Sequence, residues 1–154
     1  MAEPHAWRLD MQAALAQVRS PLTWQDAHAG SVLARPDAFG DVVLARKDAP
    51  TSYHLAVTVD DAAQGVTHIV RGADLFAATH VHRLLQALLD LAVPHYHHHP
   101  LLVGEGGARL AKRHGAPALA DLRDAGTDGP VLAAALRAGC LPPGYSLAPA
   151  PADH

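Results

Sequence analysis

The clearest helical pattern in the chain lies between residues 79 and 91. Apolar side chains recur there at helical spacing and form one broad stripe, made by Val81, Leu84, Leu85, Leu88, Leu89 and Leu91. Thr79 is a suitable N-cap, and Pro94 lies beyond the end of the pattern. A shorter stripe after Asp10 predicts a second helix, which ends before residues 20–21 because proline disfavours helical backbone in the residue before it.

Short apolar runs predict strands around these helices, at residues 7–9, 41–46, 66–72 and 96–103. The run at 66–72 is the most strand-like, because β-branched residues alternate in it and a glycine closes it. Residues 54–61 begin like a helix, but 57–61 fits a strand equally well, and periodicity does not decide between them in so short a run. Residues 22–39 are mixed in character and give no clear element.

The order of these elements predicts an α/β fold. A strand, a helix and a second strand are followed by a glycine-rich loop at residues 104–107, as in a parallel α/β unit that binds ligands at its strand ends. Two short helices are predicted at 119–125 and 131–138. The Pro- and Ala-rich residues 142–154 are predicted to be disordered.

Composition excludes several classes of function. The 154 residues are 49% hydrophobic, which is enough for an ordinary core, and their formal charge of −3 argues against a nucleic-acid-binding protein that relies on bulk positive charge. The single cysteine, Cys140, excludes an internal disulfide framework and favours a reducing cytoplasm. No run reaches the ~18 apolar residues of a membrane span, so we expect a cytoplasmic protein without a membrane partner.

Three stretches carry the candidate chemistry. They are YHLAVTVDD at 53–61, GVTHIVRGADL at 65–75, and PLL at 100–102 followed by RLAKRHG at 109–115. In this order and spacing they resemble the second half of the catalytic domain of glutamyl-tRNA synthetases, which are class I synthetases of Rossmann type. The third stretch is similar to the lysine loop of that class, K-M-S-K-S, often K-L-S-K-R in this family. The resemblance runs from about Trp7 to about Arg123.

The resemblance implies that residues 109–113 form an ATP-binding lysine loop. Lys112 matches the catalytic lysine, whose ammonium follows the negative charge that develops on the phosphates during adenylate formation. Arg109, Leu110 and Arg113 complete the ATP-binding residues. Arg109 replaces the first lysine of the loop and still offers a cation to phosphate, as a planar fork rather than a point charge.

The same resemblance assigns the substrates. Tyr53 and Arg71 match the positions that bind L-glutamate, where a guanidinium pairs with a carboxylate and a phenol adds a hydrogen bond. The implied reaction activates L-glutamate with ATP and Mg2+ to an adenylate and transfers the glutamate to tRNA.

Two features of the family are missing from the sequence. No H-I-G-H nucleotide signature occurs, and with one cysteine the zinc module of the short family members, and its zinc, are not expected. We therefore expect residues 1–139 to form the second half of a Rossmann-type class I catalytic domain followed by short helices, with 140–154 as a tail. No anticodon-binding domain follows, which favours the short glutamyl-Q tRNA(Asp) synthetases, whose acceptor is the queuosine of tRNA(Asp).

Two other interpretations stay open. The chain is an inactive fragment or a subunit that needs a separate amino-terminal half, or it is a histidine-rich metal-binding protein. The second rests on the dense histidines at 95–99. On a strand, His97 and His99 share one face and His98 takes the other, so three ligands do not converge without a turn. His80 and His82 do not face each other on a helix, and we assign no metal ligand.

Overall fold

The broad apolar stripe forms the helix α3, Ala78–Leu88. Its buried face packs into a hydrophobic core made by Met11, Ala14, Leu22, Val42, Val81, Leu84 and Leu85. The prediction that Thr79 is the N-cap is wrong, because Ala77 takes that position and Thr79 is fully buried. A 3-10 turn, η2 (Ala73–Leu75), runs almost directly into α3, and its Leu75 carbonyl oxygen accepts a hydrogen bond from the Thr79 hydroxyl.

The computed structural model describes residues 5–19, 21–104, 107–108, 110 and 118–148. The chain forms two compact units, Met1–His99 and Pro100–His154. Besides α3 and η2, the first unit contains β1 (Trp7–Leu9), α1 (Met11–Gln17), β2 (Thr23–Asp26), β3 (Gly30–Leu33), η1 (Pro36–Phe39), β4 (Val42–Ala45), α2 (Tyr53–Ala63), β5 (His68–Gly72) and β6 (His95–His99).

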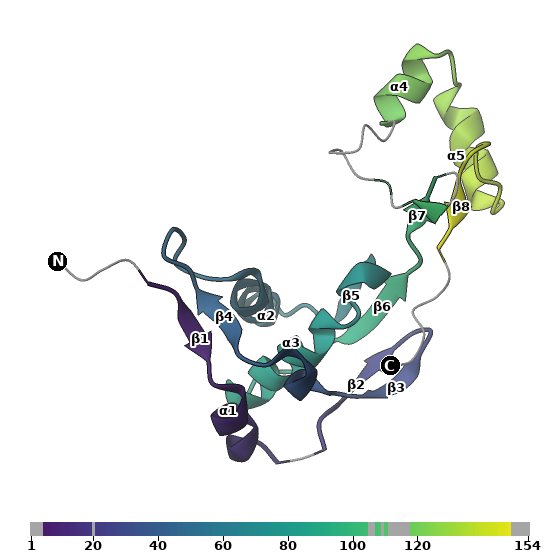
Figure 1. Cartoon of the computed structure of the whole chain (residues 1–154). Coiled ribbons are helices and arrows are strands. Elements are labelled where there is room, and N and C mark those ends of the chain that lie inside the picture. Colours follow the sequence, from purple (N-terminus) through teal and green to yellow (C-terminus); the bar gives the residue numbers. More distant parts are fainter. Residues whose placement is uncertain (1–4, 20, 105–106, 109, 111–117, 149–154) are drawn as a thin grey trace. The chain divides into compact units, whose positions relative to one another are not determined.

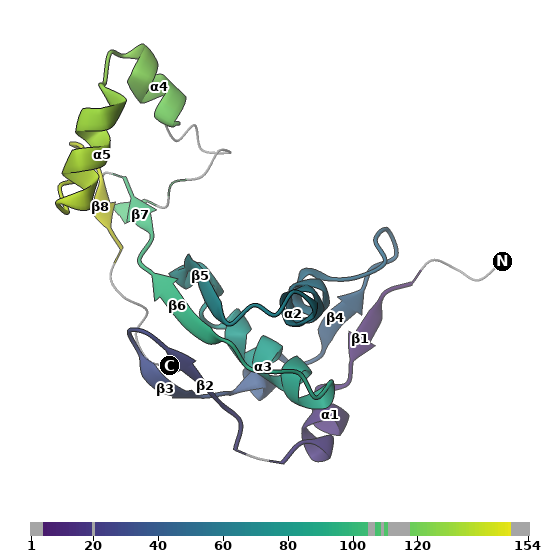
Figure 2. The same ribbon diagram turned by 180° about the vertical axis from the view of Figure 1, so that it is seen from behind.

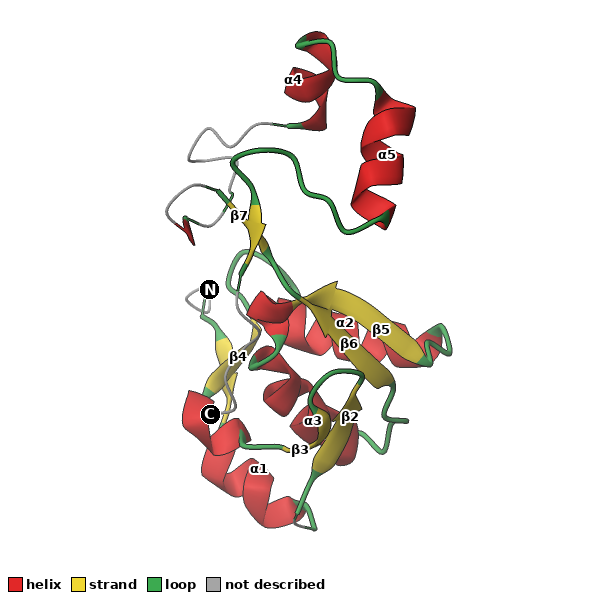
Figure 3. Cartoon of the chain, turned by 90° about the vertical axis from the view of Figure 1, so that its right-hand side faces the viewer, coloured by secondary structure: helices red, strands yellow, loops and turns green. Residues whose placement is uncertain are grey.

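A four-stranded sheet with the order β3-β2-β6-β5 organises the first unit. β6 pairs in parallel with both β2 and β5, and β2 pairs with β3 as an antiparallel hairpin. β1 and β4 form a separate antiparallel ribbon, and α2 and α3 lie between this ribbon and the sheet (Figures 1 and 3). The predicted α/β class, with its parallel β5-α3-β6 unit, is confirmed.

The structure resolves the two segments that the sequence left open. Residues 54–61 are helical, within α2, and the hydroxyl of Ser52 caps this helix by accepting from the Leu55 N–H. Residues 22–39 contain the β2–β3 hairpin, whose turn enters β3 at Gly30 with a φ of 73°, a conformation that favours glycine. In β2, Trp24 and Asp26 are buried and alternate with exposed residues. Aspartate is rarely buried, so a charged residue at a buried position of β2 hides the alternation of apolar and polar residues. The sequence pattern therefore did not predict this strand.

The second unit contains β7 (Leu102–Val103), α4 (Leu119–Asp124), α5 (Gly129–Arg137) and β8 (Ser146–Leu147), as Figure 2 shows. Both predicted short helices are present. The strand predicted over 96–103 is instead two strands, β6 and β7, separated at Pro100, which has no N–H for a ladder. The prediction of disorder is wrong for residues 146–147, because they form β8, which pairs with β7. Residues 149–154 lie outside the described part of the chain.

No helix within the described residues is both long and apolar enough to cross a bilayer.

Leu84→Ala is expected to destabilise the first unit strongly. Leu84 is fully buried in the core, so its truncation leaves a cavity that costs roughly 2–5 kcal/mol of unfolding free energy. Val59→Ala on α2 is the control, because that side chain is 41% exposed and should cost less than about 1 kcal/mol. Urea unfolding followed by tryptophan fluorescence measures both. Equal losses for the two variants would contradict the assigned core.

Candidate functional site

Arg71, near the end of β5, is the centre of the candidate site. Parallel pairing places it directly beside His98 of β6, so both side chains leave the same face of the sheet. α3 adds Thr79 and His82 to this face. The side chain of Arg71 is half-buried, and the ring of Tyr96 lies beneath it with the centroid 5.2 Å from the guanidinium carbon.

The guanidinium of Arg71 donates hydrogen bonds in several directions. Its Nε donates to Nε2 of His98 at 3.0 Å. Nη2 donates to the hydroxyl of Thr79 and to the carbonyl oxygen of Leu75 at 3.3 Å. Both Nη1 and Nη2 lie 3.3 Å from Nδ1 of His82. These contacts hold the guanidinium on three sides and fix the plane in which it lies.

The imidazoles around Arg71 are neutral. Burial, reinforced by the charge of Arg71, lowers the pKa of His82 to about 3. Burial also lowers the pKa values of His54 and His98. Because an arginine only donates, Nδ1 of a neutral His82 accepts, and its Nε2 carries the hydrogen that it donates to Nδ1 of His54 at 3.1 Å. His82 and His98 therefore accept hydrogen bonds from Arg71.

No carboxylate lies within ion-pair distance of Arg71 among the described residues. The described ion pairs join Arg46 with Asp48 and Arg123 with Asp124, and the carboxylate of Asp26 is hydrogen-bonded to the neutral imidazole of His98. Within the described part of the chain, the positive charge of Arg71 is thus held by neutral groups and has no directly paired carboxylate. An arginine in this state is suited to bind an incoming carboxylate.

Asp26 and His98 form a buried pair behind Arg71. Oδ2 of Asp26 lies 2.7 Å from Nδ1 of His98, and both side chains are 1% exposed. Burial by itself raises the pKa of Asp26, but hydrogen bonds from the Ala29 N–H, from His98 and from the His28 N–H outweigh it and lower the pKa below its ordinary value. Asp26 is therefore a charged carboxylate within the fold.

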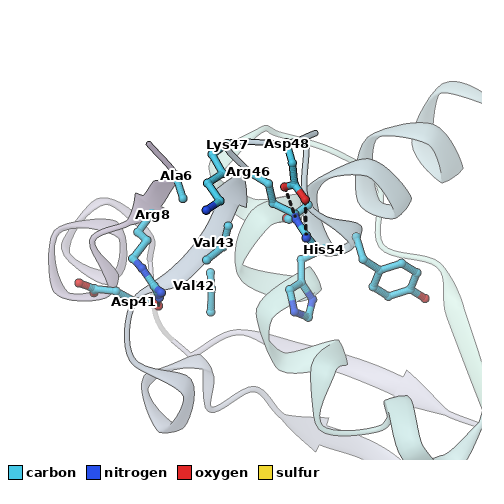
Figure 4. A pocket seen from close by; sticks show the side chains of 11 residues that line it. Ala6, Arg8, Asp41, Val42, Val43, Arg46, Lys47, Asp48 and His54 are labelled. Atoms are coloured by element: carbon cyan, nitrogen blue, oxygen red, sulfur yellow. Dashed lines mark hydrogen bonds and ion pairs between the residues drawn. The ribbon is translucent and has the colours of Figure 1, made fainter. Parts of the chain in front are cut away.

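Tyr53, the first residue of α2, is 52% exposed and faces an open cleft of about 540 Å³. Figure 4 shows Arg46 and Asp48 paired at one part of this cleft. Arg8, on β1, and Asp41, directly before β4, lie at another part of it. The lining residues are Ala6, Arg8, Asp41, Val42, Val43, Arg46, Lys47, Asp48, Ser52, Tyr53 and His54. Its charged residues are three cations and two anions, so the cleft is mixed in charge with a small positive excess.

The structure brings the two predicted glutamate-binding residues to neighbouring positions. The ring of His82 lies 6.0 Å from the ring of Tyr53, and its Nδ1 accepts from Arg71. His54 lines the cleft and contacts His82 as well, so a short chain of imidazoles joins the cleft to Arg71. No functional role was expected for His54 or His82, because their significance depends on this packing.

The predicted lysine loop lies mostly outside the described residues. Arg109, Lys112 and Arg113 are not described, so their ATP-binding and catalytic roles stay predictions. Leu110 is described and half-buried, and a Cβ placed on Gly104 would lie 3.4 Å from its side chain.

Six histidines of the first unit contact one another in pairs, His28 with His97, His54 with His82 and His68 with His95. Nε2 of His28 lies 3.1 Å from Nε2 of His97, and the rings of His68 and His95 stack at 5.3 Å. No group of three or more His, Cys, Asp or Glu side chains suited to a metal ion occurs in the described parts of the chain. His98 leaves the opposite face of β6 from His97, as alternation predicts.

The fold is that of part of a class I aminoacyl-tRNA synthetase catalytic domain. Residues 9–146 match the family of class I tRNA synthetases (E and Q), catalytic domain, and the chain belongs to this family.

Its relatives narrow the relationship further. The chain is 57% identical over 104 residues to the glutamyl-Q tRNA(Asp) synthetase of Rhodobacter capsulatus, an alignment that covers 65% of this chain and 37% of the relative. It is 44% identical over 127 residues to that of Deinococcus radiodurans, covering 80% of this chain and 43% of the relative. The chain is therefore a homologue of glutamyl-Q tRNA(Asp) synthetases and spans less than half the length of these relatives.

A solved structure agrees with this assignment. The crystal structure of a glutamate tRNA ligase from Elizabethkingia meningosepticum, in complex with its amino acid, superimposes with a TM-score of 0.54 at 27% identity. The match covers 64% of this chain and 20% of the ligase chain. The α/β fold thus corresponds to part of a class I catalytic domain.

Acid is expected to destabilise the first unit through His82. Its pKa is about 3 in the folded protein against 6.5 ordinarily, so the unfolded chain takes up a proton first as the pH falls. The part of the folding stability that depends on neutral His82 is fully present above pH 6.5 and is lost as the pH falls toward about 3. Between pH 7 and 4.5 the loss due to His82 should be on the order of 2 kcal/mol.

Urea unfolding at a series of pH values measures this loss. His82→Gln keeps an acceptor without an imidazole and should flatten the acid limb of the profile. His95→Gln, at an exposed position of β6, should leave the limb as it is. An unchanged limb in His82→Gln would contradict a buried neutral imidazole at this position.

Proposed function

We propose that this chain is the carboxy-terminal half of the catalytic domain of a glutamyl-Q tRNA(Asp) synthetase and supplies its glutamate-binding residues. The proposed reaction joins L-glutamate to the α-phosphate of ATP, releases pyrophosphate, and transfers the glutamyl group from the adenylate to the queuosine of tRNA(Asp). The observation that carries the proposal is the state of Arg71, a half-buried guanidinium held by neutral acceptors without a direct carboxylate partner among the described residues.

Charge complementarity supports a carboxylate ligand at Arg71. A half-buried cation that is surrounded by neutral imidazoles gains from a bound anion, because the site has lower dielectric than bulk water. Nη1 contacts only His82 among the described residues, which leaves donor capacity on that side of the guanidinium. A glutamate carboxylate meets both requirements.

The cleft beside Tyr53 supports a small polar ligand. Its volume of about 540 Å³ lies within the range of small-molecule sites, and Tyr53 and His54 border it. The exposed phenol of Tyr53 offers a hydrogen bond to a ligand that extends from Arg71 toward the cleft. Lys47 and Arg8 add positive charge to the same walls, which suits an anionic substrate.

The ATP-dependent part of the proposal rests on the family. Class I synthetases use ATP, and in this chain Lys112, with Arg109, Leu110 and Arg113, matches the lysine loop in sequence. We assign to Lys112 the stabilisation of the charge that moves onto pyrophosphate as it leaves. This role needs no proton transfer, because an ammonium acts there as a positioned charge.

A second candidate function is that of a subunit or part that acts only with the remainder of a synthetase. β5 is hydrogen-bonded to β6 and forms an edge of the described sheet, where Val70 is 68% exposed. An exposed, apolar strand edge is a site for adding a further strand. The chain matches 37% of the Rhodobacter capsulatus relative, so the remaining part of that protein is a candidate partner.

Glutamate binding tests the assigned site directly. Isothermal titration of the 154-residue chain with L-glutamate should show binding that Arg71→Gln abolishes. Tyr53→Phe removes one hydrogen bond and should weaken binding by roughly 3- to 10-fold. Arg123→Gln is the matched control, because Arg123 is an exposed arginine of the second unit, paired with Asp124. Binding that survives Arg71→Gln would contradict the site.

Pyrophosphate exchange tests the catalytic assignment. We expect exchange that depends on both ATP and L-glutamate when the chain is mixed with the remaining part of the Rhodobacter capsulatus relative, and its loss in Lys112→Ala. Exchange by the 154-residue chain alone would overturn the second candidate function. Exchange that Lys112→Ala retains in full would overturn the role of the lysine loop.

A further inference from the structure

A continuous hydrogen-bonded chain crosses the sheet behind the candidate site. Asp26 lies on β2, His98 on the central strand β6, and Arg71 on β5. His98 bridges the other two, with its Nδ1 2.7 Å from Asp26 Oδ2 and its Nε2 3.0 Å from Arg71 Nε. The bridging imidazole is 1% exposed, so water does not compete for either bond.

The direction of each bond in this chain is determined by chemistry. Nε of Arg71 can only donate, so Nε2 of His98 accepts. The neutral imidazole then carries its hydrogen on Nδ1 and donates it to the carboxylate of Asp26. Reversing either bond would place two donors or two acceptors against each other, so a single arrangement of hydrogens satisfies the whole chain.

The carboxylate of Asp26 is itself anchored to the backbone. Oδ1 accepts from the N–H groups of His28 and Ala29 at 2.9 and 3.0 Å, and Oδ2 accepts from the N–H of His98 at 3.2 Å. The turn of the β2–β3 hairpin therefore holds one end of the chain rigidly. From this fixed point, His98 transmits orientation to the Nε edge of Arg71.

The other contacts of Arg71 complete its orientation. Thr79 and Leu75 accept from Nη2, and the ring of Tyr96 supports the face of the guanidinium. With Nε engaged by His98, rotation of the guanidinium plane would break several hydrogen bonds at once. What stays available is the Nη1 side, next to His82.

We propose that Asp26 and His98 are positioning residues that orient Arg71 for its carboxylate ligand. The proposal rests on the proposed function, in which that ligand is L-glutamate. Asp26 does not touch the ligand. Its carboxylate fixes the tautomer of His98, and His98 in turn keeps Arg71 in one orientation. The alternative is that the pair only stabilises the fold, and the two roles differ in measurable ways.

Asp26→Asn separates these roles. The asparagine keeps the shape and, through Oδ1, the bonds from the hairpin N–H groups, but its amide nitrogen then faces Nδ1 of His98. His98 is expected to move its hydrogen to Nε2, where it opposes the N–H of Arg71. Long-range ¹H–¹⁵N NMR of the 154-residue chain should show the change of tautomer, and the Arg71 Nε–H signal should shift and exchange faster with water.

Glutamate affinity is the second measurement. Asp26→Asn and His98→Leu should each weaken L-glutamate binding roughly tenfold or more. His98→Gln should restore most of the affinity, because a side-chain amide presents a donor and an acceptor much as the imidazole does. His97→Gln is the matched control, since it lies on the same strand but contacts His28 on the other face, and both measurements should stay unchanged.

The outcomes are distinct. Unchanged affinity and an unchanged Arg71 signal in Asp26→Asn and His98→Leu would overturn the proposal while leaving glutamate binding intact. Equal loss in His98→Gln and His98→Leu would also overturn it, because a purely structural role explains that result. If Asp26→Asn does not fold, the comparison of His98→Gln with His98→Leu decides the question. Wild-type protein that does not bind L-glutamate would overturn the proposed function, and the NMR signals would then decide the positioning role by themselves.

Discussion

The parallel pairing of β6 with β2 on one side and β5 on the other is the constraint on which the site depends. It places Asp26, His98 and Arg71 on three neighbouring strands and on the face that α3 covers, with Arg71 level with His98 and Asp26 level with Tyr96. Register matters here because a shift of one residue would turn His98 to the opposite face, where His97 now lies. Arg71 is thus positioned by strand pairing first and by its own contacts second.

Two histidines, His82 and His98, acquire a common explanation in this arrangement. Taking an arginine out of water is costly unless its donors are satisfied, and a nearby carboxylate would satisfy them at the cost of closing the site to an anionic ligand. Neutral imidazoles accept hydrogen bonds without cancelling the charge. His82 and His98 do this for Arg71, and the single carboxylate of the network, Asp26, is kept one imidazole away.

The family assignment gives these observations a chemical setting. The chain belongs to the class I tRNA synthetases (E and Q) and matches glutamyl-Q tRNA(Asp) synthetases over less than half of their length. Tyr53 and Arg71 lie in the first compact unit, whereas the sequence of the lysine loop belongs to the second. Under the proposed function, catalysis depends largely on positioning and on electrostatic stabilisation, and a fixed orientation of Arg71 serves both.

The sequence by itself determined the α/β class, α3, β5 and the two short helices, because their signals are local: an apolar stripe, alternating β-branched residues and the residues that end them. Motif resemblance also predicted Arg71 and Tyr53 as glutamate-binding residues. Only the tertiary structure decided that Asp26 is buried, that Thr79 faces Arg71 rather than capping α3, and that residues 146–147 pair with β7. Each of these depends on a partner far away in the sequence. A polar side chain carries no sign, in its own segment, of the distant donor or acceptor that makes its burial favourable.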